Sequence, residues 1–292
     1  TVLATATGQV ADTITLTSLK KDTIRTMLLN LLRRKRSRPA SDLLGGLQDA
    51  HSHILPGVDD GVQTIEESLR ILERYEQAGV KSVRLTPHVM EDIPNTPEHL
   101  REVFGVLKSA YKGSIALSLA SENMLDGLLE ERLESKDVIP FEANRLLVET
   151  SYYNPPYNMD ELLDKVRSAG FFPVLAHPER YTYMGMKDYE YLRSRGVMFQ
   201  LNAASLAGYY GGEAAYKAGR LLSKGMYRYA GTDIHRESML DFLADATVSV
   251  KFLEAVEHLK AVLDNSLVKA IGPSPQVEEL HRAGILFVSE GD

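Results

Sequence analysis

The sequence predicts an α/β barrel built from seven parallel strands, each followed by a helix. Seven short runs rich in Val, Leu, Ile and Phe alternate with helix-like stretches from Gly46 onward. The runs do not alternate strictly between apolar and polar residues, which is typical of parallel strands that are covered on both faces. Repeated strand–helix units of this kind close, or nearly close, into a barrel that has its active site on one face.

A segment of different composition precedes these repeats. Residues 1–46 are rich in Thr, Ala and Leu, carry a basic run between Arg33 and Arg38, and end at Gly45 and Gly46. We interpret residues 1–46 as an N-terminal leader or linker and residues 47–292 as one catalytic domain. Met27 offers an alternative start, which would leave residues 1–26 outside the native product. The basic run is interpreted as a solvated surface cluster.

The elements of the domain follow in order along the chain. The predicted strands span residues 47–51, 82–88, 114–122, 145–150, 171–177, 197–202 and 227–233. The first helix is predicted between a capping box that begins at Thr64 and a stop at Gly79. Further helices are predicted over residues 97–111, 159–169, 187–194, 213–223 and 248–263.

The composition excludes several classes of protein. The net charge of −7 provides no basic field for a nucleic-acid backbone. The chain contains no cysteine, which excludes disulfide frameworks, thiolate metal sites and the cysteine-dependent tyrosine phosphatases. No run approaches the roughly 20 apolar residues of a membrane span, and no signal-peptide pattern begins the sequence. We therefore expect a cytoplasmic protein.

Polar side chains with metal-ligating chemistry end every predicted strand. They are His51 with His53, His88, Glu122, Glu149, His177, Asn202, and Asp233 with His235. The carboxyl ends of the strands in a barrel converge on one face, so residues far apart in the sequence are expected to meet there. His99, His258 and His281 lie in helical or tail sequence and are treated as surface residues.

The carboxylates in this set indicate cations. Glu122 and Glu149 each close an apolar run, and buried carboxylates are rare unless they are paired or coordinated. With Asp59 and Asp60 beside the first strand, the candidate ligands exceed the three or four that one catalytic zinc uses. Two or three metal ions are therefore predicted. Imidazole and carboxylate ligands without thiolate suit Mn, Fe and Zn alike.

Clustered dications favour hydrolysis of a phosphoester, because they activate water and neutralise charge on the phosphoryl oxygens. Arg180, three residues after His177, is a candidate phosphate clamp, and Arg236 is a weaker candidate whose alternative is a surface position. Asn202 could orient a ligand or cap the helix that follows it. An amidohydrolase would also use His-x-His and a late Asp, but the extra carboxylates and Arg180 favour phosphate.

Six motifs carry a resemblance to a known family. They are DAHSHILPGVDDG at residues 49–61, TPH at 86–88, ASE at 120–122, LVETS at 147–151, LAHPER at 175–180 and GTDIH at 231–235. In this order they resemble the polymerase and histidinol phosphatase (PHP) family. Within it, they are similar to the branch of manganese-dependent bacterial tyrosine phosphatases encoded with capsule and exopolysaccharide genes, the CpsB/CapC/YwqE type. The resemblance runs from about residue 47 to residue 265.

This resemblance implies a distorted seven-stranded (β/α)7 barrel of the PHP type that holds three metal ions, with Mn²⁺ favoured over Fe or Zn. One metal would be held by His51, His53, Glu122 and Asp233. Glu122 would bridge to a second metal bound by Glu149 and His177, and Asp60, His88 and His235 would hold the third. The resemblance assigns phosphate binding to Arg180, leaves Arg236 as the candidate second arginine, and places Arg180, Asp60 and His235 in the catalytic set.

The first functional hypothesis is a metal-dependent protein-tyrosine phosphatase that uses metal-activated hydroxide and acts on a tyrosine kinase of polysaccharide export. Tyr153 and Tyr157, in the segment after the Glu149 strand, could line a site for the peptide, as could Tyr181, Tyr183, Tyr209 and Tyr210. Loop packing is the alternative role for these rings. The competing functions are a small-molecule phosphomonoesterase of the histidinol-phosphatase type and a non-catalytic, metal-stabilised regulator that binds the kinase. A homo-oligomer is left open.

Overall fold

A computed structural model provides the structure of the protein and describes residues 36–269. Residues 1–35 of the expected leader lie outside the described residues, as does Met27. The compact unit begins at Arg38, before the expected boundary at residue 47. The reason is that the 3-10 helix η2 (Ala40–Leu43) carries Ala40 and Leu43 into the hydrophobic core, where they are 0% and 1% exposed.

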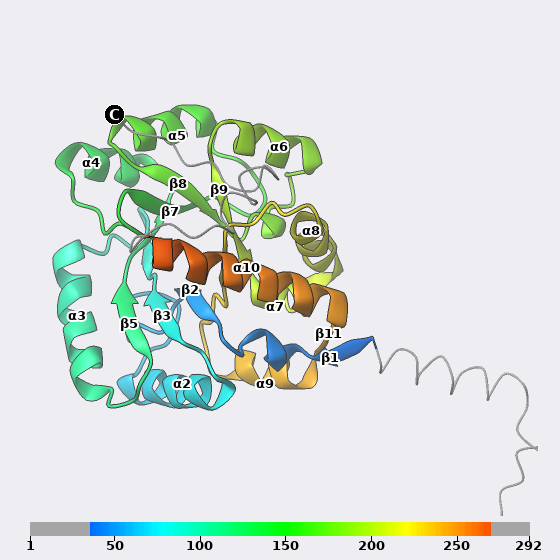
Figure 1. The fold of residues 1–292 in the computed structure, drawn as a ribbon. Helices are drawn as coiled ribbons and strands as arrows, with labels where there is room; N and C mark the ends of the chain where they lie inside the picture. Colours follow the sequence, from blue (N-terminus) through cyan, green and yellow to red (C-terminus); the bar gives the residue numbers. More distant parts are fainter. Residues whose placement is uncertain (1–35, 270–292) are drawn as a thin grey trace, which may run out of the picture. The chain divides into compact units, whose positions relative to one another are not determined.

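The described residues form a mixed α/β fold whose main strands are parallel (Figure 1). A six-stranded sheet has the order β10-β9-β8-β7-β6-β4, and a three-stranded sheet has the order β2-β3-β5. Their strands are β2 (Gln48–Ser52), β3 (Ser82–Leu85), β4 (His88–Val89), β5 (Ala116–Leu119), β6 (Glu122–Met124), β7 (Arg145–Glu149), β8 (Phe172–Ala176), β9 (Met198–Asn202) and β10 (Tyr229–Gly231). The short strands β1 (Ser37–Pro39) and β11 (Thr247–Ser249) form a sheet of their own. Each predicted strand is therefore present at least in part.

Two of the predicted strands are interrupted, which the sequence analysis did not anticipate. Residues 82–88 form β3 and β4, and residues 114–122 form β5 and the start of β6. Pro87 lies in the first break, and because proline has no backbone N–H it cannot donate to a ladder. Its carbonyl still accepts a hydrogen bond from Glu122 N at 3.0 Å, so the neighbouring segments stay side by side across the interruption.

Strands β2 and β10 lie next to each other although no ladder joins them. Asp233 N donates to His51 O at 2.8 Å, and His53 N donates to Ile234 O at 2.9 Å. Gly231 makes this approach possible, because a Cβ at this position would lie 2.5 Å from His51 Cβ. The first and last predicted strands, and the ligand candidates that follow them, are thereby brought together.

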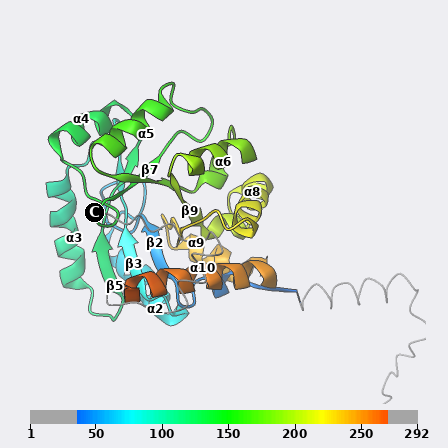
Figure 2. The ribbon, with the colours of Figure 1, turned by 45° about the horizontal axis from the view of Figure 1, so that its top comes forward.

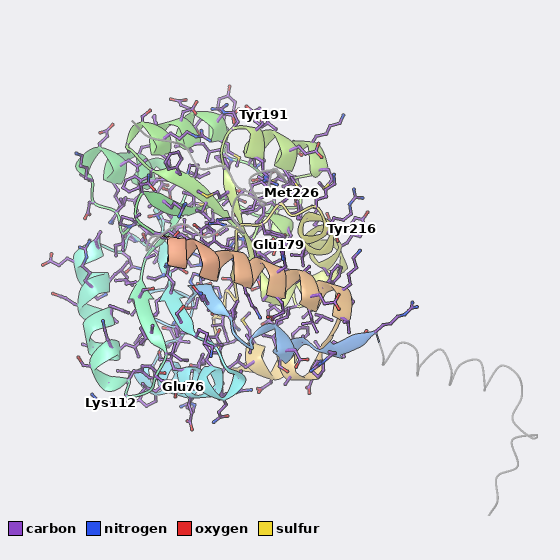
Figure 3. All side chains as sticks on the ribbon, viewed as in Figure 1. Glu76, Lys112, Glu179, Tyr191, Tyr216 and Met226 are labelled. Atoms are coloured by element: carbon purple, nitrogen blue, oxygen red, sulfur yellow. The ribbon has the colours of Figure 1, made fainter. Side chains whose placement is uncertain are left out.

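Helices lie around the outside of the strands (Figures 1 and 2). Those that the sequence predicted are α2 (Ile65–Ala78), α3 (Pro97–Ala110), α5 (Met159–Ser168), α6 (Met186–Ser194), α8 (Gly211–Ser223) and α10 (Val250–Lys269). The hydroxyl of Thr64 accepts a hydrogen bond from Glu67 N, and Gly79 ends α2 with a φ of 85°, as the capping pattern predicted. The short helices α4 (Gly127–Ser135), α7 (Ala203–Leu206) and α9 (Ser238–Asp245) were not predicted. Side chains from helices and strands fill the space between them (Figure 3).

Candidate metal centre

All nine side chains predicted to bind metal gather near the carboxyl ends of the strands. His51 lies in β2 and Glu149 ends β7, whereas His88 and Glu122 begin the short strands β4 and β6. Of the others, His53 and Asp60 follow β2, His177 follows β8, and Asp233 and His235 follow β10. The nine residues form four overlapping groups, in each of which the ligand atoms lie within 4.8 Å of one another. These groups are His51, His53 and Asp233; His51, Glu122 and His177; His88, Glu122 and Glu149; and His53, Asp60, His88 and His235.

Glu122 occupies the middle of this cluster. Its Oε2 lies 3.2 Å from Nε2 of His51, 3.2 Å from Nε2 of His53 and 3.2 Å from Nδ1 of His88. Its Oε1 lies 3.0 Å from Nε2 of His177. A carboxylate with both oxygens engaged in this way can bridge two cations. Burial alone would raise the pKa of Glu122, but the surrounding imidazoles hold that pKa well below its usual range.

Two further carboxylates flank the histidines on either side. Asp233 Oδ1 lies 3.4 Å from His51 Nε2 and 3.3 Å from His53 Nε2. Glu149 Oε1 lies 2.8 Å from His88 Nδ1, and Glu149 Oε2 lies 3.9 Å from His177 Nε2. Both carboxylates are almost completely buried. Their charge is therefore balanced within the cluster rather than by water.

Asp60 marks the side of the cluster that is open to solvent. Its side chain is 66% exposed, and its Oδ1 lies 3.4 Å from His88 Nε2 and 3.6 Å from His235 Nε2. A substrate that approaches from solvent therefore meets Asp60 and His235 before the buried ligands.

The hydrogen bonds behind three histidines fix which ring nitrogen faces the cluster. Gln200 Oε1 accepts from His177 N at 3.3 Å, which identifies it as the amide oxygen, and it lies 3.0 Å from His51 Nδ1. His51 Nδ1 must then carry the hydrogen, so Nε2 is the nitrogen left to bind a cation. Asp59 Oδ2, 2.9 Å from His53 Nδ1, and the backbone oxygen of Asp233, 2.9 Å from His235 Nδ1, impose the same tautomer.

This arrangement revises the expected role of Asp59, which the sequence analysis counted among the ligands. Asp59 belongs to none of the four groups, since it faces the far nitrogen of His53 and also accepts hydrogen bonds from the backbone N–H groups of His88 and Gly61 at 3.0 Å. The sequence analysis missed Gln200 altogether. The signal that could have indicated it is an amide inside the apolar run of β9, two residues before Asn202 and therefore on the same face of the strand.

The donor set fits metal ions. His51 Nε2 and His53 Nε2 lie only 2.9 Å apart, and both point at carboxylates. Four buried atoms of the cluster form no hydrogen bond of normal geometry with the described residues, although two of them, His88 Nδ1 and Glu149 Oε1, lie 2.8 Å apart: His88 Nδ1, Glu149 Oε1, His177 Nδ1 and Asp233 Oδ1. Buried polar atoms are normally satisfied, and dications would satisfy several of these. His177 and Asp233 also have φ values of 33° and 54°, in the left-handed region that few non-glycine residues adopt.

Arg180 places a cation beside the cluster. It ends the 3-10 helix η3 (Pro178–Arg180), and its guanidinium lies 4.3 Å from the ring centre of Tyr152 and 3.9 Å from that of Tyr210. Its Nη1 donates to Asp233 Oδ2 at 2.5 Å, and the side chain is only 13% exposed. Two aromatic rings and a carboxylate thus hold the guanidinium in one orientation. Arg236, in contrast, is exposed and forms no side-chain hydrogen bond or ion pair with the described residues.

Asn202 fills both of the roles that the sequence left open. Its Oδ1 accepts from Ala204 N at 2.8 Å, which caps α7, and its Nδ2 donates to Asp233 Oδ2 at 2.8 Å. Glu179, the residue before Arg180 in the LAHPER motif, has a structural role. Its buried carboxylate accepts hydrogen bonds from Asn202 N and from the hydroxyl of Tyr227, each at 2.9 Å.

The tyrosines divide into packing residues and exposed residues. Tyr181 is completely buried and donates to Ala176 O at 3.0 Å, so it packs inside the loop and cannot line a substrate site. Tyr153 and Tyr157 are 72% and 107% exposed. Tyr183 and Tyr210 are partly buried, and Tyr209 packs edge-on against Tyr210.

None of the described helices combines the length and the apolar character that a membrane span requires.

Comparisons with known proteins agree with this geometry. A family model described as capsular polysaccharide synthesis, CpsB/CapC, matches residues 47–242. The chain is 26% identical over 201 residues to the tyrosine-protein phosphatase YwqE of Bacillus subtilis, which covers 66% of this chain and 79% of that protein. It is 32% identical over 146 residues to the tyrosine-protein phosphatase CpsB of Streptococcus pneumoniae, covering 46% of this chain and 57% of that protein.

The fold is also similar to a solved structure. Crystal structures of YwqE from Bacillus subtilis and CpsB from Streptococcus pneumoniae, described as metal-dependent tyrosine phosphatases, include a chain that matches with a TM-score of 0.66 at 22% identity. The match covers 75% of this chain and 92% of that chain. At 22% identity, this likeness shows the fold alone.

Proposed function

The chain belongs to the CpsB/CapC family of capsular polysaccharide synthesis, and on that premise we propose that it is a metal-dependent protein-tyrosine phosphatase. Its relatives YwqE and CpsB are tyrosine-protein phosphatases. The observation that carries the proposal is the set of four overlapping His and carboxylate groups that lies beside Arg180. Such a site combines ligands for several cations with a fixed guanidinium that can bind a phosphate.

The proposal includes a finer account of the fold and of the domains. We propose that the strands form the distorted seven-stranded barrel of the PHP type. In support, the hydrogen bonds between His51, His53 and the residues after β10 bridge the two sheets. Residues 47–292 remain the proposed catalytic domain and residues 1–46 the proposed leader, whose last residues, from Arg38 onward, pack with the domain as one compact unit.

Three metal ions are proposed for the centre, with Mn²⁺ as the favoured metal and Fe or Zn as alternatives. His51, His53, Glu122 and Asp233 would hold the first metal, and Glu122, Glu149 and His177 the second. Asp60, His88 and His235 would hold the third. One distance modifies this partition: Glu149 lies 2.8 Å from His88 and 3.9 Å from His177, so it is shared between the second and third positions. When bound, the metals supply positive charge for the phosphoryl oxygens and lower the pKa of water.

The residues of the chain supply binding and orientation. Arg180 binds two phosphoryl oxygens through its guanidinium, which Tyr152 and Tyr210 keep flat between their rings. Asp60 and His235, at the solvent side, complete the proposed catalytic set. Burial and the neighbouring His53 lower the pKa of His235 to about 4, which favours the neutral imidazole that a metal ion requires. Arg236 remains the candidate second phosphate contact.

The proposed reaction is direct hydrolysis. A water oxygen bonds to phosphorus as the bond from phosphorus to the tyrosyl oxygen breaks, and that oxygen takes up a proton. The chain has no cysteine to form a thiophosphate intermediate. The proposed substrate is a phosphorylated tyrosine kinase of polysaccharide export, and the proposed location is the cytoplasm.

The substrate class is tested by comparing phosphate release from a phosphotyrosyl peptide and from histidinol phosphate with Mn²⁺-loaded protein. Faster release from the peptide is the expected result. Cleavage of histidinol phosphate alone would assign the site to a small-molecule phosphomonoesterase. Turnover of neither compound, with metal-dependent binding to a tyrosine kinase, would indicate the non-catalytic regulator.

A further inference from the structure

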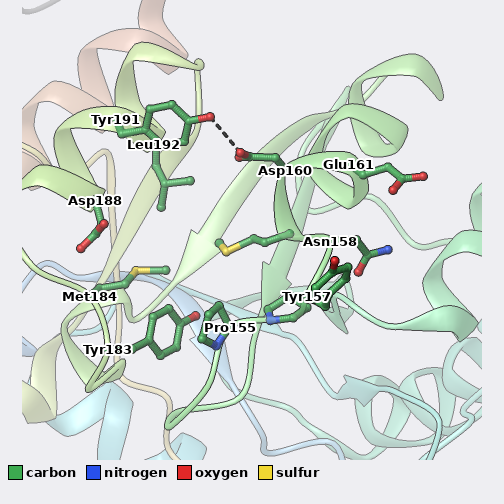
Figure 4. A pocket seen from close by; sticks show the side chains of 12 residues that line it. Pro155, Tyr157, Asn158, Asp160, Glu161, Tyr183, Met184, Asp188, Tyr191 and Leu192 are labelled. Carbon is green, nitrogen blue, oxygen red and sulfur yellow. Dashed lines mark hydrogen bonds between the residues drawn. The ribbon is translucent and has the colours of Figure 1, made fainter.

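A groove lies on the same side of the fold as the metal centre. It runs between the loop that joins β7 to α5 and the loop that joins β8 to α6, and it has a volume of about 700 Å³ (Figure 4). The floor is apolar, because Met159 and the largely buried Met184 and Leu192 line it. The rim carries the carboxylates of Asp160, Glu161 and Asp188, and the described residues that line this groove include no lysine or arginine.

The rim carboxylates are only partly neutralised by their neighbours. The Glu161 side chain is 65% exposed, and Lys165, which lies 3.6 Å from it, makes a shorter contact of 2.6 Å with Glu130. Asp160 accepts from the hydroxyl of Tyr191 at 2.8 Å, a contact that spans the groove in Figure 4, and lies 3.8 Å from Arg195. Asp188 accepts a hydrogen bond from Gly185 N at 2.7 Å and forms no ion pair with the described residues. The groove therefore presents an acidic rim above an apolar floor.

A row of aromatic rings connects the groove to the metal centre. The ring of Tyr152 lies 5.8 Å from that of His177, and the rings of Tyr152, Tyr181 and Tyr183 follow one another at 6.1 and 5.9 Å. Tyr183 is itself part of the groove wall. Thr182 N donates to Tyr152 O at 2.8 Å, which ties the two loops together along this row. The ring centres of Tyr152 and Tyr183 are therefore no more than about 12 Å apart, a distance that three to four residues of extended chain would span on the surface above the buried Tyr181.

We propose that this groove binds the polypeptide that flanks the phosphotyrosine, and that it selects a lysine or arginine three to four residues away from it. This inference rests on the proposed function and adds a specificity determinant to it. The aliphatic stem of the basic side chain lies beside Met184 and Leu192, and its charged end meets a carboxylate of the rim, where Asp188 and Glu161 lie on opposite sides in Figure 4. Tyr157, which is 107% exposed on the loop between β7 and α5, adds an aromatic surface for the bound chain.

Matched phosphopeptides test the proposal. Each peptide carries one phosphotyrosine and has Lys, Ala or Glu three or four residues before or after it. For the wild-type protein with Mn²⁺, we expect kcat/KM for the best lysine peptide to exceed that of its glutamate counterpart by about threefold to tenfold, because exposed ion pairs each contribute only modestly and the glutamate peptide is also repelled by the rim. The difference should lie mainly in KM and shrink at high salt.

Variants separate the groove from general effects of charge. The double variant Glu161→Gln, Asp188→Asn should bring the lysine-to-glutamate ratio close to one, because it removes both carboxylate charges. The fold should be kept, since the amide oxygen of asparagine can still accept the hydrogen bond from Gly185 N. Glu161→Lys should favour the glutamate peptide. The control is Glu190→Gln, which removes a carboxylate from the same helix outside the groove, where it pairs with Lys224 at 3.4 Å. The control should keep the wild-type ratio.

Two further readouts distinguish failure of the groove from failure of the phosphatase function. Hydrolysis of free phosphotyrosine reports the metal centre alone. Fluorescence anisotropy of the labelled peptides reports binding without turnover. Equal affinity of the wild-type protein for lysine and glutamate peptides, or a preference that survives in the double variant, would overturn the proposal whether or not phosphate is released.

Discussion

Replacing Gln200 by leucine should weaken metal binding although Gln200 is not a candidate ligand. Its single amide oxygen accepts from His51 Nδ1 at 3.0 Å and from His177 N at 3.3 Å. The side chain is completely buried, so water cannot take its place. In Gln200→Leu the imidazole of His51 loses the contact that fixes its tautomer, and the backbone of His177 loses an acceptor at a residue with a φ of 33°.

The expected magnitude follows from these two contacts. A buried donor left without a partner costs about 1–3 kcal/mol. Loss of the group that orients a ligating histidine typically lowers metal affinity about 10–100-fold, which corresponds to about 1.4–2.7 kcal/mol. We therefore expect Gln200→Leu to lower the melting temperature of the metal-free protein by several degrees and to raise the Kd for Mn²⁺ at least tenfold.

The assay is a titration of metal-stripped protein with Mn²⁺ in competition with a fluorescent chelator. Tyr229→Phe is the control, because it removes a partly buried hydrogen bond, from the hydroxyl to Glu142 Oε2 at 2.7 Å, at the end of β10 remote from Asp233. The control should lose stability and keep its metal affinity. A Kd for Gln200→Leu within twofold of the wild-type value would refute the orienting role.

Three other predictions address the centre and its surroundings. Removing metal with a chelator should lower the melting temperature by about 5–10 °C for each site that was saturated by free metal at about 100 times the Kd of that site. An unchanged calorimetric transition would count against structural metal binding. Arg180→Lys should lower kcat/KM for phosphotyrosine about 10–100-fold, because lysine keeps the charge but loses the planar fork; steady-state rates of this variant and of Arg236→Lys show which arginine contacts phosphate. Gly231→Ala should destabilise the fold by about 1–3 kcal/mol in denaturant titrations, since its Cβ would lie 2.7 Å from His51 N, whereas Gly105→Ala on the exposed face of α3, where nothing lies within 4 Å, should not.

The sequence was most informative about residues at the ends of strands. His51, His88, His177 and Asp233 could be placed on one face because parallel strands present their carboxyl ends together. Their gathering into four groups agrees with that expectation. The function of these residues as ligands stays a prediction until metal binding is measured.

Contacts between side chains on different elements were beyond sequence reasoning. Asp59 and Asp60 are neighbours in the chain, yet Asp59 faces His53 from behind and Asp60 faces the cluster at its solvent side. Which of two adjacent carboxylates points inward depends on the path of a loop, and composition does not specify that path. Gln200 was hidden for a related reason, because one amide in an apolar strand does not reveal its partners.

The strand interruptions and the groove were also missed. Pro87 could have indicated a break, but the neighbouring apolar residues suggested one continuous strand. The groove depends on how the loops after β7 and β8 lie against each other, which a hydrogen bond from Thr182 N to Tyr152 O fixes at a sequence separation of 30 residues. Helical and strand periodicity report local structure and carry no information about such a contact.

The central claim is that the clustered histidines and carboxylates hold metal ions that make phosphotyrosine hydrolysis possible. The most direct test measures metal content and phosphate release together while metal-stripped wild-type and His177→Ala proteins are titrated with Mn²⁺. We predict that activity of the wild-type protein on a phosphotyrosyl peptide rises as metal is bound, and that His177→Ala stays inactive at the same metal concentrations. Full activity without metal, or equal activity of His177→Ala, would contradict the account.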